Sequence, residues 1–272
     1  MNEEWQGGAG ESWAAEWRRT DRSFGALTEE LLKRSRAFRF TQALDVGCGA
    51  GELSLALARG RPHVRVVGVD ISPQLLAVAR ERSANLANLA FEEADAAQWQ
   101  PPAGFAPDLV ASRHGVMFFD DPKAAFTHMA RLAAPGCGLL FSCFRARADN
   151  PFFNEVARLL PAQDPPGDPE GPGPFAFADP ARVERILTAA GWREVALAPF
   201  DFAMVAGGGA DPVEDAAQYF LCIGPAARAA AALAPDERER FADRVRALAA
   251  RNVFDGIVSL RAAAWLVTAR KP

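Results

Sequence analysis

Glycines and an acidic residue alternate in one short segment, Asp45-Val46-Gly47-Cys48-Gly49-Ala50-Gly51. Glycines let the backbone approach a ligand closely and adopt positive φ angles, and a helix that follows presents free N–H groups to it. The dinucleotide fingerprint needs a third glycine where this chain has Glu52, and no Gly-Lys-Ser/Thr phosphate loop follows. The pattern instead favours a nucleoside with an amino-acid end, whose ammonium would meet Asp45 while its carboxylate meets backbone N–H groups.

Two further acidic residues follow the next predicted strands. Asp70 ends the β-branched run that begins at Val64, where a carboxylate can accept both hydroxyls of a ribose. Because NAD-binding folds use the same arrangement, Asp70 alone does not identify the ligand. Asp95 follows the third strand and can accept the amino group of an adenine, while Ala96 donates its backbone N–H to the ring. A solvated loop charge or a helix cap is the alternative for each acid.

These segments resemble a known family. The run 44–51 resembles motif I of the class I S-adenosylmethionine-dependent methyltransferases, Val69-Asp70-Ile71-Ser72 their motif II, and Ala94-Asp95-Ala96 their motif III. The resemblance covers roughly residues 35–200 and is nearest to the ubiquinone and menaquinone C-methyltransferases and to bacterial small-molecule methyltransferases. It implies S-adenosylmethionine as cofactor and S-adenosylhomocysteine as product. The residues it implies around the cofactor are Asp45, Gly47, Cys48, Gly49, Gly51, Asp70, Ile71, Asp95, Ala96, Ser112 and Arg113.

The segment Ser112-Arg113-His114-Gly115-Val116-Met117-Phe118-Phe119 leaves the fourth predicted strand beside the expected sulfonium. A near-neutral pKa would suit His114 as a general base, which is needed only where the acceptor must lose a proton. A loop histidine that merely shapes the pocket is the competing interpretation. Arg113 could bind an acidic acceptor or be a surface charge. The other residues expected at the acceptor or in a lid, with core packing as their alternative, are Trp13, Trp17, Met117, Phe118 and Tyr219.

Strands and helices alternate from Ala43 onward, which predicts an α/β fold with a doubly wound, mostly parallel sheet. The resemblance implies a Rossmann-like sheet of seven strands whose C-terminal strand is antiparallel. We expect an N-terminal helical lid over residues 1–40 and a cofactor-binding domain over residues 41–210 and 260–272. A helical insertion over residues 211–259 would contribute to the acceptor pocket.

The stretch Pro161–Pro174 contains six prolines and three glycines, so it cannot continue a helix or a central strand. We expect a long loop here. Long loops inside compact domains are often lids or binding loops, and a plain surface excursion is equally compatible with the composition.

Composition narrows the class of protein. Thirty basic and 34 acidic residues give a net charge of −4, which argues against a general nucleic-acid binder. The four cysteines have no C-x-x-C spacing, so reduced thiols are expected and no metal site is predicted. No signal peptide or apolar run of about 20 residues is present. We therefore expect a cytoplasmic protein that acts on a small molecule without binding a membrane; a homodimer is left open.

The predicted function is methyl transfer to a small organic acceptor by in-line displacement at the sulfonium, with O-, N- or C-methylation undecided. An NAD-dependent oxidoreductase is the first rival, and Glu52 in place of the third glycine argues against it. A non-catalytic cofactor-binding protein is the second, which retention of Asp45, the glycines and Asp70 disfavours. An RNA or protein methyltransferase is the third, but neither a basic stripe nor an Asn-Pro-Pro-Tyr-like motif is present.

Overall fold

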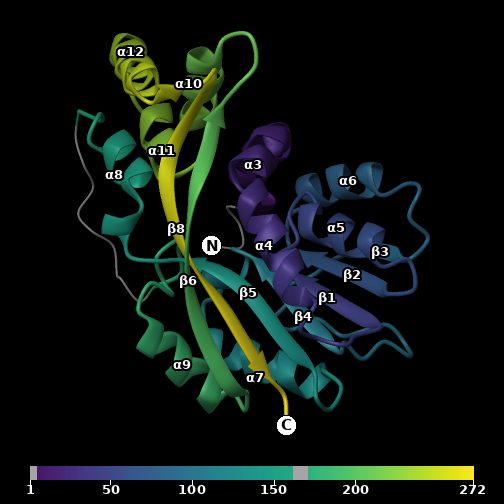
Figure 1. The fold of residues 1–272 in the computed structure, drawn as a ribbon. Helices are drawn as coiled ribbons and strands as arrows, with labels where there is room; N and C mark the ends of the chain where they lie inside the picture. The colour runs from purple at the N-terminus through teal and green to yellow at the C-terminus, as the bar shows by residue number, and fades with distance from the viewer. Residues whose placement is uncertain (1–4, 162–170) are drawn as a thin grey trace.

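One mixed sheet forms the centre of the computed structural model, which describes residues 5–161 and 171–272 (Figure 1). The strand order is β3-β2-β1-β4-β5-β8-β6, with β8 antiparallel to both of its neighbours. The expected doubly wound α/β sheet with an antiparallel last strand is thus confirmed, and a two-residue strand, β7, adds a hairpin to β8. The strands are β1 (Gln42–Val46), β2 (Arg65–Asp70), β3 (Leu89–Glu93), β4 (Leu109–Arg113), β5 (Gly138–Phe144), β6 (Arg193–Gly207), β7 (Val253–Phe254) and β8 (Ile257–Arg270).

The chain order reverses between β1 and β4, which pair as parallel neighbours at the middle of the sheet. Parallel strands that are covered on both faces have continuous apolar sequences. Strand β5 is an example, since it is buried along its whole length. A reversal of this kind leaves a crevice at the carboxyl ends of the strands, where open α/β sheets bind their ligands. Asp45 and Asp70 lie at the carboxyl ends of β1 and β2, and Asp95 follows β3, so the topology brings these acidic residues to one edge.

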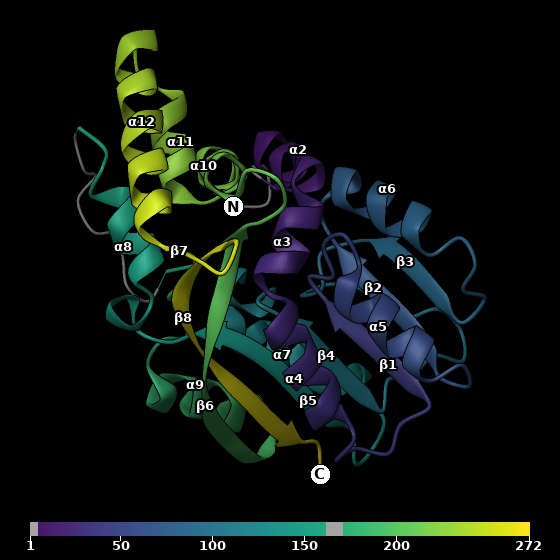
Figure 2. The ribbon, with the colours of Figure 1, turned by 45° about the horizontal axis from the view of Figure 1, so that its top comes forward.

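Helices cover both faces of the sheet. Figures 1 and 2 show α4, α5 and α6 on one face and α7 and α9 on the other. Ser72, Asp121 and Asp179 each precede a proline, a pattern that predicts a helix N-cap, and each accepts a backbone N–H in the first turn of α6, α7 and α9. These helices are α4 (Gly25–Ser35), α5 (Glu52–Gly60), α6 (Pro73–Arg82), α7 (Pro122–Leu132) and α9 (Pro180–Ala189).

The N-terminal segment is helical as expected, but it consists of α2 (Gly8–Ala15), α3 (Trp17–Ser23) and then α4, with breaks at Glu16 and Phe24. The four-residue spacing of Trp13 and Trp17 predicts one shared helix face, but the two residues lie on successive helices, so this expectation is wrong. The breaks let the segment bend over the crevice edge of the sheet.

Strands β6 and β8 are longer than the sequence indicates. The apolar pattern predicts strands over Val195–Phe200 and Ala262–Ala269, whereas β6 continues seven residues beyond Phe200 and β8 begins five residues before Ala262. The additional residues pair with each other beyond the end of β5. Figure 2 shows further helices gathered at that end of the long pair. They are α8 (Pro151–Ala157), α10 (Pro212–Cys222), α11 (Pro225–Ala231) and α12 (Pro235–Arg251).

Most of the proline-rich loop predicted at Pro161–Pro174, namely residues 162–170, lies outside the described residues. Its far end is fixed at the crevice, since the Gly173 N–H donates to the Met117 carbonyl over 3.1 Å. In the described part of the chain, no helix combines the length and the apolar character needed to cross a membrane.

Candidate functional site

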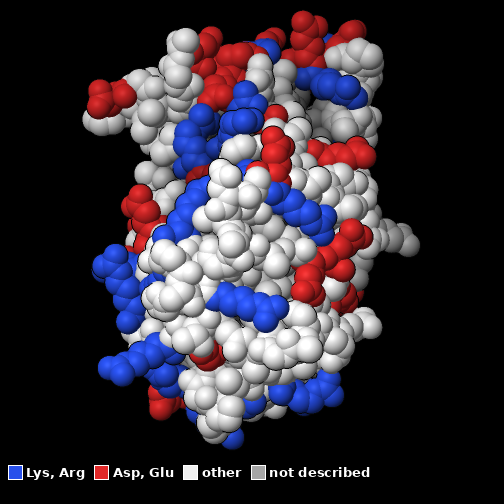
Figure 3. All heavy atoms as spheres, turned by 90° about the vertical axis from the view of Figure 1, so that its right-hand side faces the viewer, with Lys and Arg blue, Asp and Glu red and all other residues white. Residues whose placement is uncertain are grey.

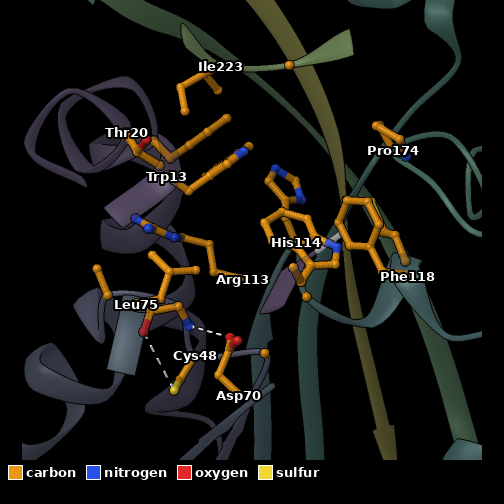
Figure 4. A pocket seen from close by; sticks show the side chains of 18 of the residues that line it. Trp13, Thr20, Cys48, Asp70, Leu75, Arg113, His114, Phe118, Pro174 and Ile223 are labelled. Carbon is orange, nitrogen blue, oxygen red and sulfur yellow. Dashed lines mark hydrogen bonds between the residues drawn. The ribbon is translucent and has the colours of Figure 1, made fainter. Parts of the chain in front are cut away.

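A cavity of about 270 Å³ opens at the carboxyl edge of β1, β2, β3 and β4. Figure 4 shows Asp70 and Cys48 at one end of it, and His114 and Phe118 on the opposite side. The predicted site residues that line the cavity are Trp13, Trp17, Asp45, Gly47, Cys48, Gly49, Asp70, Ile71, Asp95, Ala96, Arg113, His114, Met117, Phe118 and Tyr219. Gly51 and Ser112, which were also predicted, do not line it.

The glycine loop is held close to the sheet. The Gly47 and Cys48 N–H groups both donate to the Val69 carbonyl, over 2.9 and 3.1 Å. Gly47 has a φ of 63°, and a Cβ there would lie 2.8 Å from the Gly115 Cα. Gly51 has a φ of 85°, and its missing side chain makes room for the Phe91 ring and not for the cavity. Gly51 is thus needed to pack the start of α5, which explains why it does not line the cavity.

Asp70 ties the glycine loop to the next helix. Its carboxylate accepts the Gly49 N–H over 2.8 Å and the Ser72 N–H over 2.9 Å. Burial raises the pKa of Asp70, and these backbone hydrogen bonds oppose that shift. An ionised carboxylate has about four acceptor positions, so both oxygens keep capacity for hydroxyl groups of a ligand.

Asp45 is fully buried, and only one of its two carboxylate oxygens has a hydrogen-bond partner among the described residues. Its Oδ2 accepts the Ser54 hydroxyl over 2.6 Å, whereas its Oδ1 has no hydrogen-bond partner among the described residues. Burial raises the pKa of Asp45 to about 7, partly offset by the Ser54 hydrogen bond and the charge of Arg113. A buried carboxylate oxygen without a partner is costly, and a cationic group entering the cavity would satisfy it.

Asp95 and Ser112 both make local hydrogen bonds. Asp95 accepts the Ala97 N–H over 2.9 Å within a turn that no helix follows, and it lines the cavity. The Ser112 hydroxyl donates to the Val46 carbonyl over 2.7 Å and accepts the Gly115 N–H over 3.1 Å. Ser112 therefore joins the ends of β1 and β4 beneath the cavity.

A chain of charged side chains connects the N-terminal helices to the sheet. Arg113 donates to Asp21 over 3.0 Å and to the Thr28 hydroxyl over 2.9 Å. Asp21 also pairs with Arg82 over 2.8 Å, and Arg82 pairs with Glu52 over 2.6 Å. The guanidinium of Arg113 is thus held by the protein itself, which leaves its predicted role toward an acidic acceptor without support. No local sequence pattern identifies Asp21 or Arg82 as part of this site.

Aromatic side chains of the N-terminal segment cover the cavity. The guanidinium carbons of Arg82 and Arg18 lie over the Trp17 indole, 3.9 and 4.5 Å from its centroid. The Trp13 ring contacts Trp5 at 5.6 Å between centroids. The Trp5 ring in turn meets the edge of the Phe118 ring at 5.3 Å, so the segment reaches both sides of the cavity.

His114 has a backbone φ of 61°, in the left-handed region that side chains other than glycine rarely adopt. Its ring stacks on Phe144 with 4.1 Å between centroids and meets the edge of Phe24. Its Nε2 is buried and has no hydrogen-bond partner in the described chain. Burial, together with the charge of Arg113, lowers the pKa of His114 to about 3. The expected near-neutral pKa is therefore wrong for this pocket, and the general-base role stays a prediction.

The remaining wall of the cavity comes from β5, α8 and α10. Met117 is buried, and its sulfur accepts the Phe144 N–H over 3.4 Å. Tyr219 of α10 is also buried, and burial raises its pKa, which the neighbouring side chains of Ser23 and Thr20 partly oppose. The sequence did not identify the other wall residues, Phe144, Arg147, Phe152 and Phe153.

The described residues contain no group of three or more His, Cys, Asp or Glu side chains that could hold a metal ion. The lining of the cavity, with carboxylates at the glycine-loop end and aromatic rings at the other, suits an organic ligand.

Comparisons with known proteins agree with this geometry. Residues 43–136 match a family model described as a methyltransferase domain. A trans-aconitate 2-methyltransferase of Methylobacterium radiotolerans is 34% identical over 173 residues, which are 62% of this chain and 61% of that protein. A malonyl-[acyl-carrier protein] O-methyltransferase of a Paenibacillus species is 28% identical over 43% of this chain and 45% of its own length. The chain thus spans roughly half of the curated relatives it matches.

Solved structures share the fold. The crystal structure of a putative methyltransferase from Bacillus halodurans aligns over 90% of this chain and 98% of its own, with a TM-score of 0.55 and 21% identity. The predicted resemblance to class I methyltransferases and the predicted fold are thereby confirmed.

Proposed function

We propose that this chain, a class I methyltransferase by its fold and its matched segment, transfers a methyl group from S-adenosylmethionine to a small organic acceptor. The observation that carries the proposal is the unpartnered Oδ1 of buried Asp45, which lines the same cavity as Asp70 and the glycine loop. A ligand with an ammonium group and a ribose satisfies both carboxylates at once, whereas a nicotinamide dinucleotide has no ammonium group to offer Asp45.

Each part of the cofactor has candidate partners in the glycine-loop half of the cavity. Asp45 would hold the ammonium, the loop N–H groups the carboxylate, and Asp70 the ribose hydroxyls. Asp95 and Ala96 would hold the adenine. Bound there, S-adenosylmethionine supplies an electrophilic methyl group on a cationic sulfur. The protein's own task is to position the acceptor and to exclude water.

The N-terminal helices suit the exclusion of water. Trp13 and Trp17 line the cavity, and the ion pairs of Asp21 hold α3 against α6 and β4. We therefore assign residues 1–40 as a lid over the domain formed by residues 41–210 and 260–272. Tyr219 and Ile223 bring the insertion of residues 211–259 to the acceptor side.

A small acceptor is supported by charge and by relatives. Figure 3 shows acidic and basic side chains interspersed over the side of the molecule that carries α5 and α6, and the chain as a whole is acidic. The relatives described above are named for methyl transfer to trans-aconitate and to malonyl-[acyl-carrier protein]. The four free cysteines suit a reducing compartment such as the cytoplasm.

Titration calorimetry separates this function from its main rival. We expect saturable binding of S-adenosylhomocysteine and none of NADH, followed by transfer of label from methyl-labelled S-adenosylmethionine to a member of a panel of phenols, amines, quinones and carboxylic acids. Saturable NADH binding without a response to S-adenosylhomocysteine would overturn the proposal. Binding of the homocysteine compound without turnover on any acceptor would favour a non-catalytic cofactor-binding protein.

A further inference from the structure

Two arginines line the cavity, and they differ in what neutralises them. Arg113 is paired with Asp21. Arg147 has no carboxylate within ion-pair distance in the described chain, and its guanidinium carbon lies 4.7 Å from the centroid of the Phe175 ring. Its neighbour Arg145, which does not line the cavity, is paired with both Asp149 and Asp201. Arg147 is thus an uncompensated cation at the cavity wall.

The charges of the cavity are segregated. Its four acidic residues come from α3 and from the ends of β1, β2 and β3, all on the glycine-loop side. The opposite wall, between β5 and α8, contributes aromatic rings and the guanidinium of Arg147. Because complementary charge steers and fixes ligands, this wall disfavours a cationic acceptor and favours one that carries an anionic group.

The backbone beneath Arg147 is fixed although its side chain is exposed. Asn150, which is fully buried, donates to the carbonyls of Ala146 and Ala263 over 3.2 and 3.1 Å. Its own Oδ1 accepts the Ala263 N–H over 2.8 Å. These bonds clamp the short helix η2 (Arg147–Asp149) to β8. The Phe175 face below the guanidinium further restricts its orientation.

Aromatic rings separate Arg147 from His114. The His114 ring stacks on Phe144, the centroid of Phe144 lies 6.1 Å from that of Phe175, and Arg147 lies over Phe175. The buried Nε2 of His114 and the guanidinium of Arg147 are therefore polar groups at two ends of an aromatic surface. A ligand that matches this surface has an apolar, flat body, a polar atom near His114 and an anion at its far end.

We infer that Arg147 is a specificity-determining residue that binds a carboxylate of the acceptor, at the end remote from the atom that is methylated. This inference rests on the proposed function, since it takes the ligand to be the acceptor of the methyl group. Arginine suits the task because its planar fork can bind a carboxylate through two parallel N–H bonds.

The test compares acids with their own uncharged amides. We would titrate the chain, with and without saturating S-adenosylhomocysteine, with 4-hydroxybenzoate, 4-hydroxyphenylacetate and 4-hydroxycinnamate and with the amide of each. We expect at least one acid to bind tenfold or more tightly than its amide. In Arg147→Gln this preference should fall below twofold while the amide's affinity stays unchanged, and Arg147→Lys should keep part of it.

Arg145→Gln is the matched control, since it removes a neighbouring arginine that does not line the cavity, and it should keep the full preference. The inference is overturned if no acid is preferred over its amide, if the preference survives in Arg147→Gln, or if Arg145→Gln abolishes it as well. Failure to bind S-adenosylhomocysteine would count against the proposed function and not against the role of Arg147. The comparison of acids with amides on the ligand-free chain would still decide that role.

Discussion

Asp21 of α3 and Arg113 at the end of β4 form an ion pair of 3.0 Å, across 92 residues of sequence. Both side chains are about 15% exposed or less, so water screens the pair only partly. Asp21 also pairs with Arg82 of α6, and it therefore fastens the N-terminal helices to two elements that border the cavity. The lid and the cofactor end of the site are coupled through this one carboxylate.

Replacing Asp21 should loosen the lid. In Asp21→Asn the two arginines lose their shared counter-charge, and we expect an affinity for S-adenosylhomocysteine about tenfold lower, or about 1–2 kcal/mol. Hydrogen exchange of α3 should accelerate in parallel. Glu30→Gln is the control, because it breaks two ion pairs within α4 whose residues do not line the cavity. Equal affinities of Asp21→Asn and wild type would refute the coupling of lid and cofactor.

Asp70→Ala should abolish cofactor binding while the protein stays folded. The substitution removes the proposed ribose partner, and it also releases the Gly49 N–H that orders the glycine loop. We expect a loss of more than a hundredfold in affinity for S-adenosylhomocysteine by calorimetry, with a folded circular dichroism spectrum. Asp108→Ala is the matched control, since Asp108 also accepts two backbone N–H groups but does not line the cavity. An affinity within threefold of wild type would remove the ribose assignment.

The cofactor half of the site was predictable because its determinants are local. Asp45 and the glycines lie within seven residues, and Asp70 follows at the end of the next strand, so parallel pairing of β1 and β2 must bring them together. The caps of α6 and α9 were predictable for the same reason, since each depends on three or four consecutive residues.

The acceptor half was not predictable, because its residues meet only through tertiary contacts. Asp21 pairs with Arg113, and Phe144 stacks on His114, although the members of each pair are far apart in the sequence and no local pattern predicts the contact. The length of β6 was missed because Asp201 interrupts its apolar pattern, although pairing with β8 continues through it. The positive φ of His114 was not predictable either, because a histidine does not indicate a left-handed backbone in the way that a glycine does.

His114 should affect turnover more than cofactor binding. We expect His114→Asn, which removes the ring stacked on Phe144, to misplace the acceptor and lower kcat by about 10²-fold, and to leave the affinity for S-adenosylhomocysteine within twofold. Asparagine is chosen in preference to alanine because it tolerates the positive φ at this position. His63→Asn, at an exposed turn, is the control. If the pH–rate profile of His114→Asn matches that of wild type, His114 is not a base and acts at most by positioning the acceptor.

The low pKa of His114 also has a consequence for stability. Because burial holds the folded pKa near 3, below the ordinary 6.5, the unfolded chain binds a proton between these values and the folded chain does not. His114 therefore contributes stability that is fully present above pH 6.5 and is lost as the pH falls toward 3. Urea unfolding of His114→Asn between pH 6.5 and 4 should show a smaller loss on acidification than wild type.

Asp45 titrates in the opposite sense, and its substitution should stabilise the ligand-free protein. Its folded pKa of about 7 lies above the ordinary 3.8, so the folded chain binds the extra proton between these values and stability falls as the pH rises through them. Above pH 7 the buried charge is fully present and opposes folding. We expect Asp45→Asn, which keeps an acceptor for Ser54, to raise the free energy of unfolding at pH 8 by about 1–3 kcal/mol. This gain should shrink as the pH falls toward 4.

Adding S-adenosylhomocysteine should make wild type more stable than Asp45→Asn, the reverse of the order expected without ligand. Saturating S-adenosylhomocysteine should stabilise wild type strongly, because its ammonium would satisfy the unpartnered Oδ1 of Asp45, and should stabilise Asp45→Asn little. Urea unfolding at pH 5 and pH 8, with and without the ligand, measures both effects. Asp121→Asn, a helix cap outside the cavity, should change neither. Equal stabilisation of wild type and Asp45→Asn by the ligand would mean that Asp45 does not meet the ammonium, and a less stable Asp45→Asn at pH 8 would mean that the buried charge is compensated within the protein.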